Sequence, residues 1–311
     1  MSDSDFGTIS KRAFRCECIT STFIAAGIVS LEFIWPGPPP RCGQFFLVKP
    51  SRTGSFLGCP VSVAGYKSRK AGGTASIRYS LEQWEKRGSV IERRKKLDRN
   101  IDSDQRINID RRFDDGGILR FIVSRRDRIS GDIVDMRPGE EAELIGPLGN
   151  FWPLDDILPD FFKGNHVAGP VALVGGGIGI ASLLMIAPAL ENKSYDFYAG
   201  FRTGSFGLEG LNPKALIVAT EDGSAGVKGN ILDFFIPKGY SRVFTSGPKP
   251  MMRAVANLCI AGGIPSFVSA EKHITCGVGV CRGCNVRTTG GRRRCCTDGP
   301  IFSGEEIIFD E

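Results

Sequence analysis

The sequence is poor in histidine and has no long hydrophobic run. His166 and His273 are its only histidines, and no Ser–His–Asp or paired-carboxylate arrangement can be found. The longest apolar stretch, residues 23–35, is too short to span a bilayer and contains Glu32, so we interpret it as two strands. Residues 1–5 are polar and acidic, unlike a signal peptide. These absences argue against a hydrolytic triad and a membrane partner, and we expect a cytoplasmic protein.

A disulfide framework is also missing, although the chain has ten cysteines. Half of them lie outside the C-terminal region without a regular spacing, which suits a reducing compartment: Cys16, Cys18, Cys42, Cys59 and Cys259. Acidic and basic residues are interleaved and the net charge is only +6, so composition does not indicate nucleic acid binding. At 311 residues, with 40 glycines, the chain is long enough for two or three α/β or α+β domains.

The most specific pattern lies near the C-terminus. Cys276, Cys281 and Cys284 form a C-x4-C-x2-C motif, and a fourth thiol follows at Cys295 or Cys296. This is the spacing of plant-type ferredoxins, in which four thiolates bind a [2Fe–2S] cluster. Gly277, Gly279 and Gly283 would let the loop wrap closely around the cluster. A structural zinc site usually has two C-x2-C pairs, so zinc and disulfides are the weaker alternatives.

The N-terminal half reads as short strands separated by proline and glycine. Besides the two strands within residues 23–35, we expect strands at residues 43–48, 60–64, 74–80, 119–123 and 141–145. Short strands with turn signals between them predict a small antiparallel barrel.

Residues 81–115 interrupt this pattern with a dense run of both charges. Trp84, Ile91, Leu97 and Ile101 recur near helical spacing, so part of the segment could form an amphipathic helix. A solvated insertion between barrel strands and a partner-docking arm are both open interpretations. Nucleic acid binding is less favoured because no aromatic residues are interleaved with the basic ones.

The character of the chain changes after His166. A buried strand at residues 171–174 leads into the glycine-rich residues 175–179 and then a predicted helix at 180–190. Further strands are expected at 195–201, 215–219, 243–246 and, last, 267–269, with helices at 230–235 and 251–261. This alternation predicts a doubly wound parallel sheet. The glycine turn lacks the full Rossmann spacing, so alone it is a weak signal.

Ligands bind at the carboxyl ends of the strands in such sheets. Four polar or glycine-rich loops would lie on that rim, at residues 175–179, 200–202, 221–224 and 246–249. Each could be an ordinary loop, but together they favour a nucleotide site.

The assembled motifs resemble the ferredoxin–NADP reductase superfamily, and more closely the electron-transfer subunits of class 1B dihydroorotate dehydrogenase. The most specific likeness is the cysteine motif followed by Cys296-Thr-Asp-Gly-Pro-Ile-Phe302. In the family the last ligand precedes such a segment, which favours Cys296 over Cys295. The resemblance implies an antiparallel flavin-binding barrel at 1–165 with the charged insertion 81–115, an NAD(P)-binding α/β domain at 166–270, and a small [2Fe–2S] domain at 271–311.

The resemblance also implies site residues. For FAD these are Cys59, Pro60, Val61, Ser62, Ile122, Val123, Ser124, Gly131 and Asp132. For the nicotinamide nucleotide they are Gly175, Gly176, Gly177, Gly179, Glu221, Asp222, Gly247 and Pro248. The implied metal ligands are Cys276, Cys281, Cys284 and Cys296, and no catalytic residue is implied.

Two departures from the family concern the FAD site. Cys59 and Ser124 stand where the family has arginine, and charge-assisted hydrogen bonds to a diphosphate are the strong ones. Arg52, Arg125 and Arg126 are candidates to replace them.

The function implied is electron transfer between NAD(H), FAD and a [2Fe–2S] cluster. The implied partner is an FMN-containing dihydroorotate dehydrogenase catalytic subunit in pyrimidine biosynthesis, joined in a heterotetramer. One alternative is a reductase subunit for a different oxidoreductase, and another is a non-catalytic binding protein on a degenerate reductase scaffold. NADP in place of NAD is also open, since Arg202 could meet a 2′-phosphate.

Overall fold

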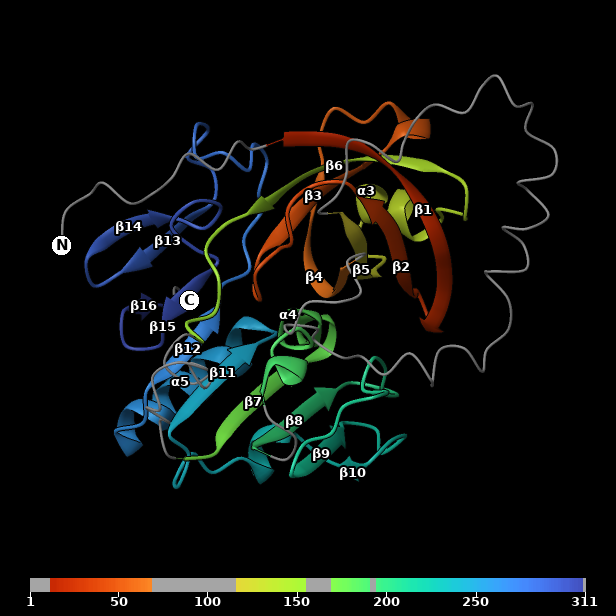
Figure 1. The fold of residues 1–311 in the computed structure, drawn as a ribbon. Helices are drawn as coiled ribbons and strands as arrows, with labels where there is room; N and C mark the ends of the chain where they lie inside the picture. The colour runs from red at the N-terminus through yellow and green to blue at the C-terminus, as the bar shows by residue number, and fades with distance from the viewer. Residues whose placement is uncertain (1–11, 69–115, 155–168, 191–193, 310–311) are drawn as a thin grey trace, which may run out of the picture.

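The computed structural model describes residues 12–68, 116–154, 169–190 and 194–309. Within these residues a closed β-barrel lies beside a parallel sheet, and a small three-stranded sheet is built from the C-terminal residues (Figure 1). The predicted strand at 74–80, the charged insertion 81–115 and His166 lie outside the described residues. No helix in the described part of the chain is long and apolar enough to cross a membrane.

The barrel has six antiparallel strands in the order β1-β2-β5-β4-β3-β6. Their bounds are Arg12–Ala25 (β1), Ile28–Trp35 (β2), Phe45–Pro50 (β3), Cys59–Ser68 (β4), Gly117–Ser124 (β5) and Glu141–Leu148 (β6). Trp35 and Phe46 meet edge to face in the barrel core, and Phe121 packs on both Phe46 and Phe33. Such aromatic pairs add to the free energy gained by burying their surface. The predicted antiparallel barrel is confirmed.

Two short helices belong to the barrel. The 3-10 helix η1 (Ser51–Thr53) follows β3, and α3 (Arg128–Val134) follows β5. Asp127 caps α3: its carboxylate accepts a hydrogen bond of 2.8 Å from the backbone N–H of Ser130. This cap satisfies one of the backbone donors that a helix start leaves free.

The parallel sheet has the order β10-β9-β8-β7-β11-β12, extended by an antiparallel seventh strand, β15. Its parallel strands are Val171–Gly176 (β7), Tyr195–Phe201 (β8), Ala215–Thr220 (β9), Val227–Lys228 (β10), Arg242–Ser246 (β11) and Ser266–Ser269 (β12). The chain runs outward from β7 through β10, then returns to the other side of β7 with β11. The doubly wound arrangement is therefore confirmed, with its switch point between β7 and β11.

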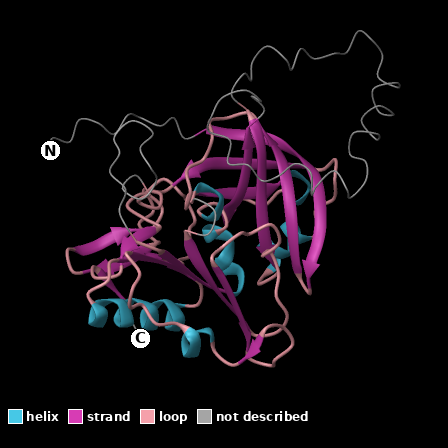
Figure 2. Cartoon of the chain, turned by 60° about the horizontal axis from the view of Figure 1, so that its bottom comes forward, coloured by secondary structure: helices cyan, strands magenta, loops and turns pink. Residues whose placement is uncertain are grey.

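Helix is sparse in this sheet domain (Figure 2). The helix predicted at 180–190 is wrong in extent: after η4 (Gly177–Gly179), α4 covers only Ile180–Leu183, and η5 covers Ala187–Ala189. Pro188 lacks a backbone N–H, so a regular helix cannot continue through it. The segment predicted as a helix at 230–235 is the 3-10 helix η6, Ile231–Phe234.

The helix predicted at 251–261 is confirmed as α5, Lys249–Gly262. Val255 and Cys259 on its buried face join Val243 of β11 in one hydrophobic cluster. The helix ends at Gly263, whose φ of 66° is the left-handed conformation that favours glycine.

The C-terminal residues form β13 (Asn285–Thr288), β14 (Gly291–Arg294), β15 (Ile301–Ser303) and β16 (Ile307–Ile308). β14, β13 and β16 make the three-stranded sheet, whereas β15 pairs antiparallel with β12. The strand predicted at 267–269 is confirmed as β12, the last parallel strand, but β15 adds an antiparallel strand that the sequence analysis did not predict. A three-residue strand leaves too short an apolar run to be recognised in the sequence.

Asn150, just after β6, connects the barrel to the segment before β15. Its side-chain amide donates to the carbonyls of Asp298 (3.1 Å) and Ile301 (2.7 Å) and accepts from the N–H of Ile301 at 2.9 Å. Its own backbone N–H donates to the carbonyl of Gly299 at 2.6 Å. One side chain thus completes three hydrogen bonds between parts of the chain far apart in sequence.

We predict that Asn150→Ala lowers the free energy of unfolding by about 2–4 kcal/mol, because three partly buried hydrogen bonds are lost at roughly 1 kcal/mol each. Thermal or urea unfolding of the purified chain measures this. Asn257→Ala, at an exposed position of α5, is the matched control and should change stability little. Equal stability of the two variants would contradict the role given to Asn150.

Candidate cofactor cavity and iron–sulfur loop

A cavity of about 830 Å³ lies where the barrel, the parallel sheet and the start of the C-terminal region meet. The barrel contributes the start of β4, the end of β5 and the start of α3. The sheet contributes the turns after β7 and β11, which flank the switch point, and residues 269–275 complete the wall. Open α/β sheets bind ligands at this place, and the volume is that of a small-molecule site.

Most of the predicted nucleotide and flavin residues line this one cavity. They are Cys59, Pro60, Val61, Ser62, Ile122, Val123, Ser124, Gly176, Gly177, Gly179, Gly247 and Pro248. Of the four loops predicted at the sheet rim, those after β7 and β11 reach the cavity.

Five predicted residues are not part of the lining: Gly131, Asp132, Gly175, Glu221 and Asp222. Gly131 and Asp132 lie within α3, and Gly175 lies within β7, where a Cβ would meet Ile180. Glu221 and Asp222 are exposed, and their backbone N–H groups donate to Phe201 and Arg202. The loops after β8 and β9 therefore bind each other.

Hydrogen bonds to the Asp222 carboxylate hold the loops after β8 and β9 together. The Ser224 hydroxyl and backbone N–H, with Thr203, lower the pKa of Asp222 to about 2. Ser224 in turn accepts from the N–H of Gly204 at 2.7 Å. Asp222 is thus a charged, structured part of the rim outside the cavity.

The turns after β7 and β11 approach each other closely. A Cβ on Gly179 would lie 2.5 Å from both the Cα and the N of Gly247, and a Cβ on Gly176 would lie 2.7 Å from Pro248 and Met251. Gly247 itself has a φ of 155°, which few other residues adopt. Glycine at these positions lets the two turns form a narrow crevice at the switch point.

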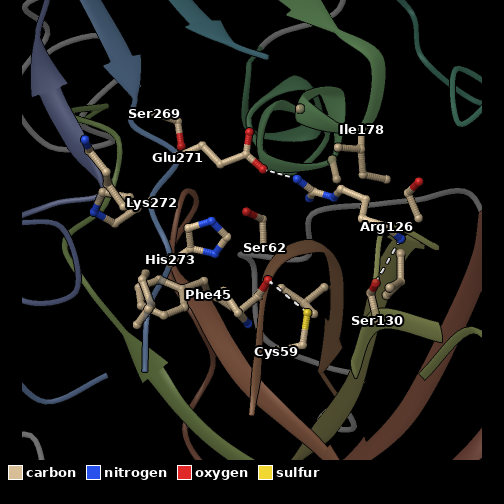
Figure 3. A pocket seen from close by; sticks show the side chains of 18 of the residues that line it. Phe45, Cys59, Ser62, Arg126, Ser130, Ile178, Ser269, Glu271, Lys272 and His273 are labelled. Carbon is tan, nitrogen blue, oxygen red and sulfur yellow. Dashed lines mark hydrogen bonds and ion pairs between the residues drawn. The ribbon is translucent and has the colours of Figure 1, made fainter. Parts of the chain in front are cut away.

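Several lining residues were missed by sequence reasoning: Phe45, Asp127, Ser130, Glu271, Lys272 and His273. In Figure 3, Arg126 and Glu271 extend toward each other across the opening of the cavity and form an ion pair. Residues 271–273 precede the cysteine motif, and nothing in their spacing signals that they reach the flavin side of the fold.

Arg52, Arg125 and Arg126, the candidates to replace the missing arginines of the FAD site, have different surroundings. Arg52 donates to the backbone carbonyl of Asp132 at 2.9 Å, and Arg125 pairs with Asp135. Only Arg126 lines the cavity. Burial and the charge of Asp127 raise the pKa of the Cys59 thiol and the charge of Arg126 lowers it, so that the pKa is about 11. Arg126 is therefore the one of the three arginines whose charge acts on Cys59.

The iron–sulfur loop is shaped by residues with positive φ. Gly277 and Gly279 have φ of 67° and 82°, as expected. A Cβ on Gly277 would lie 2.9 Å from Leu148 and Leu47 of the barrel, so the loop packs closely on it. Gly283 does not have a positive φ, and the residue with positive φ between the second and third thiols is Arg282, at 56°.

The thiols of the motif lie in two pairs. The Cys281 side chain hydrogen-bonds to Cys276, and the Cys284 side chain hydrogen-bonds to Cys296. Backbone N–H groups point at the sulfurs as well, from Val278 to Cys276 and from Gly283 to Cys281, each at 3.5 Å. Burial alone would raise the pKa of Cys276, but hydrogen bonds from the backbone N–H groups of Cys281, Val278 and Val280 and from the Cys281 side chain outweigh it and lower the pKa to about 6. The loop therefore favours a thiolate there.

Cys295 and Cys296 face different surroundings. The Cys295 thiol is fully buried and donates to the backbone carbonyl of Ala270 at 3.3 Å. Burial raises the pKa of Cys295 to about 12, as expected for an inert structural thiol. Burial and the Cys284 contact raise the pKa of Cys296 as well, but Cys296 lies beside a thiol of the motif. This geometry favours Cys296 as the fourth ligand.

The donor set fits a binuclear cluster. The four thiols lie in two pairs, Cys276 with Cys281 and Cys284 with Cys296. A [2Fe–2S] cluster requires two pairs, since each iron takes two thiolates from the protein.

Comparison with known proteins identifies the family. Residues 271–308 match the family described as the iron-sulfur cluster binding domain of dihydroorotate dehydrogenase B. The dihydroorotate dehydrogenase B (NAD+) electron transfer subunit of Clostridium acetobutylicum is 40% identical over 178 residues, which cover 57% of this chain and 68% of that protein. The chain belongs to the family of dihydroorotate dehydrogenase B electron transfer subunits.

Other members of this family extend the match. The subunit of Clostridium perfringens is 34% identical over 62% of this chain and 77% of its own length. That of Caldanaerobacter subterraneus subsp. tengcongensis is 27% identical over 95% of this chain and 98% of its own. The resemblance drawn from the motifs is confirmed, and so is the assignment as an electron-transfer subunit of an oxidoreductase.

Solved structures support the fold. An NADH-dependent reduced ferredoxin–NADP oxidoreductase superposes with a TM-score of 0.68 at 23% identity, covering 95% of this chain and 90% of that one. Phthalate dioxygenase reductase superposes with a TM-score of 0.52 at 16% identity, covering 91% and 77%. At these identities the likeness concerns the fold alone, and the three-part fold class is confirmed.

We predict that Cys296→Ser strongly alters the visible and EPR spectra of the cluster, because it removes a thiolate from a pair. Cys295→Ser is the matched control and should leave the spectra unchanged, since a hydroxyl can still donate to Ala270. The reverse pattern would assign Cys295 as the ligand.

We predict that Gly179→Ala weakens NADH binding at least tenfold, because its Cβ would push apart the turns on either side of the switch point. Titration of NADH by fluorescence measures the effect. Gly262→Ala in α5 provides a control for glycine loss in the same sheet domain, since its φ is not positive and its added Cβ would make only ordinary contacts, at 3.6 Å from Ile264 and 3.8 Å from Pro237. Unchanged NADH affinity in Gly179→Ala would place the nucleotide elsewhere.

Proposed function

We propose that this chain moves electrons between NAD(H), FAD and a [2Fe–2S] cluster on behalf of a dihydroorotate dehydrogenase catalytic subunit. The observation that carries the proposal is the single cavity bounded by the barrel, by the switch point of the parallel sheet and by residues 269–275. Those last residues run directly into Cys276. The barrel, the switch point of the sheet and the stretch that leads to the iron–sulfur loop therefore border the same cavity.

The lining residues suit a bound flavin. Ser62 and Ser124 contribute hydroxyls from adjacent barrel strands, while Val61, Ile122 and Val123 supply the apolar surface that a ring system needs. A flavin, when bound, supplies the conversion between a two-electron hydride and single electrons. The protein's part is to bind and orient this group and to keep water away from it.

The crevice beside the switch point suits the nicotinamide nucleotide. Gly176, Gly177, Gly179, Gly247 and Pro248 line it, and the absence of side chains lets a diphosphate come close to the backbone. We propose NAD rather than NADP as the nucleotide, because the relatives of this chain are named dihydroorotate dehydrogenase B (NAD(+)) electron transfer subunits.

The iron–sulfur loop would hold its cluster through Cys276, Cys281, Cys284 and Cys296. The backbone N–H groups that point at Cys276 and Cys281 would stabilise negative charge on the sulfurs. Such hydrogen bonds help to set the reduction potential of a cluster.

We further propose that the catalytic partner contains FMN and that the two proteins form a heterotetramer in pyrimidine biosynthesis. The proposed domains are an FAD-binding barrel at 1–165, an NAD(P)-binding α/β domain at 166–270 and a [2Fe–2S] cluster domain at 271–311. The free cysteines of the barrel and of α5 suit the cytoplasm, where thiols stay reduced.

We predict that the anaerobically purified chain binds FAD, with flavin absorbance near ~450 nm, and that NADH bleaches both flavin and cluster bands. Co-expression with the catalytic subunit should give one stable complex that reduces NAD+ with dihydroorotate. The chain alone should not oxidise dihydroorotate.

Two outcomes would contradict the proposal. A chain that takes up no flavin would be a binding protein on a degenerate reductase scaffold. A chain that reduces acceptors with NADH but forms no complex with the dehydrogenase would serve another oxidoreductase.

A further inference from the structure

The barrel wall of the cavity carries a negative charge. The Asp127 carboxylate lines the cavity and accepts hydrogen bonds from the backbone N–H and the hydroxyl of Ser130, both at 2.8 Å. These bonds hold the pKa of Asp127 below its usual range, so the group is ionised at neutral pH. A diphosphate bound against this wall would be repelled unless a cation lay nearby.

Cys59 and Ser124, which border the same part of the wall, carry no positive charge. The cations among the lining residues are Arg126 and Lys272, with His273 as a titratable third. Binding of a diphosphate at the barrel side of the cavity therefore depends on which of these cations lies on that side.

Arg126 belongs to the barrel side of the cavity, between β5 and α3, and its backbone is held in place. Its N–H donates to the hydroxyl of Ser130 at 2.9 Å, so the residue is fixed to the start of α3. Its positive charge offsets part of the rise that burial and Asp127 give to the pKa of the Cys59 thiol on β4. Lys272 lies on the opposite side of the cavity in Figure 3, in the stretch that leads to the iron–sulfur loop.

The guanidinium of Arg126 is paired but remains available. Its partner is Glu271, and the two side chains are 54% and 55% exposed. Exposed ion pairs contribute little free energy because water screens them. A diphosphate carries more charge and accepts two parallel hydrogen bonds from a guanidinium, so it can displace Glu271 from Arg126.

We propose that Arg126 is the residue that binds the diphosphate of FAD in this protein, and that Glu271 holds its guanidinium over the cavity until the flavin binds. The inference rests on the proposed function, because it presumes that FAD occupies the barrel side of the cavity. It adds the cation that Cys59 and Ser124 do not supply.

The test compares FAD with riboflavin, which has the same ring system but no phosphate, on the full-length chain with its cluster. Dissociation constants come from quenching of flavin fluorescence. Arg126→Gln should weaken FAD binding about 10- to 100-fold, the range expected for a charge-assisted contact, and leave riboflavin binding unchanged. Arg126→Lys keeps the charge and should recover part of the loss.

Three further variants sharpen the test. Arg125→Gln is the matched control, because Arg125 pairs with Asp135 and does not line the cavity, and its FAD affinity should equal that of the wild type. Glu271→Gln removes the competing carboxylate and should tighten FAD binding. Lys272→Gln tests the rival cation.

The proposal is overturned if Arg126→Gln binds FAD as tightly as the wild type, or if Arg126→Lys is as weak as Arg126→Gln. It is also overturned if Lys272→Gln, and not Arg126→Gln, selectively loses FAD. A wild-type chain that binds neither flavin refutes the proposed function instead, so the two failures can be told apart.

Discussion

The position of the iron–sulfur loop relative to the cavity depends on how the stretch from Ser269 to Cys276 is held. It leaves the carboxyl end of β12, passes along the cavity and enters the iron–sulfur loop. Backbone and side chains fix its start: the N–H of Ala270 donates to the carbonyl of Pro300 at 2.8 Å, and the Cys295 thiol donates to the carbonyl of Ala270. Because this short stretch joins the sheet to the iron–sulfur loop and lines the cavity, these hydrogen bonds at Ala270 help to fix the distance between the cavity and the loop.

The cysteines outside the iron–sulfur motif differ from Cys276 in the surroundings of their thiols. Thiols away from the motif, such as Cys16, Cys18 and Cys42, have pKa values raised by burial and serve as small core residues. Cys276 is the thiol whose pKa the backbone lowers. One chain thus keeps several cysteines inert by burial and favours a thiolate at Cys276 through the hydrogen bonds around its sulfur.

Features that depend on local sequence could be predicted. The C-x4-C-x2-C spacing, the glycine turn after residue 174 and the alternating strands led to the correct family and fold class. Contacts between distant segments could not, because no pattern in residues 271–273 shows that they line a cavity with Cys59. The pairing of β15 with β12 and the positive φ of Arg282 are likewise imposed by packing. Pro188, by contrast, is a local signal in the sequence, and it indicates that a regular helix does not extend over residues 180–190.

The pairing of β15 with β12 makes the iron–sulfur region an insertion between two strands of one sheet, rather than an appendage at the end of the chain. Both ends of the inserted segment are anchored: one where the chain leaves β12, the other where β15 returns to the same sheet edge with Asn150 beside it. A region held at two points cannot swing outward as a tethered domain does without breaking these bonds. Any protein that exchanges electrons with the cluster must therefore come to it.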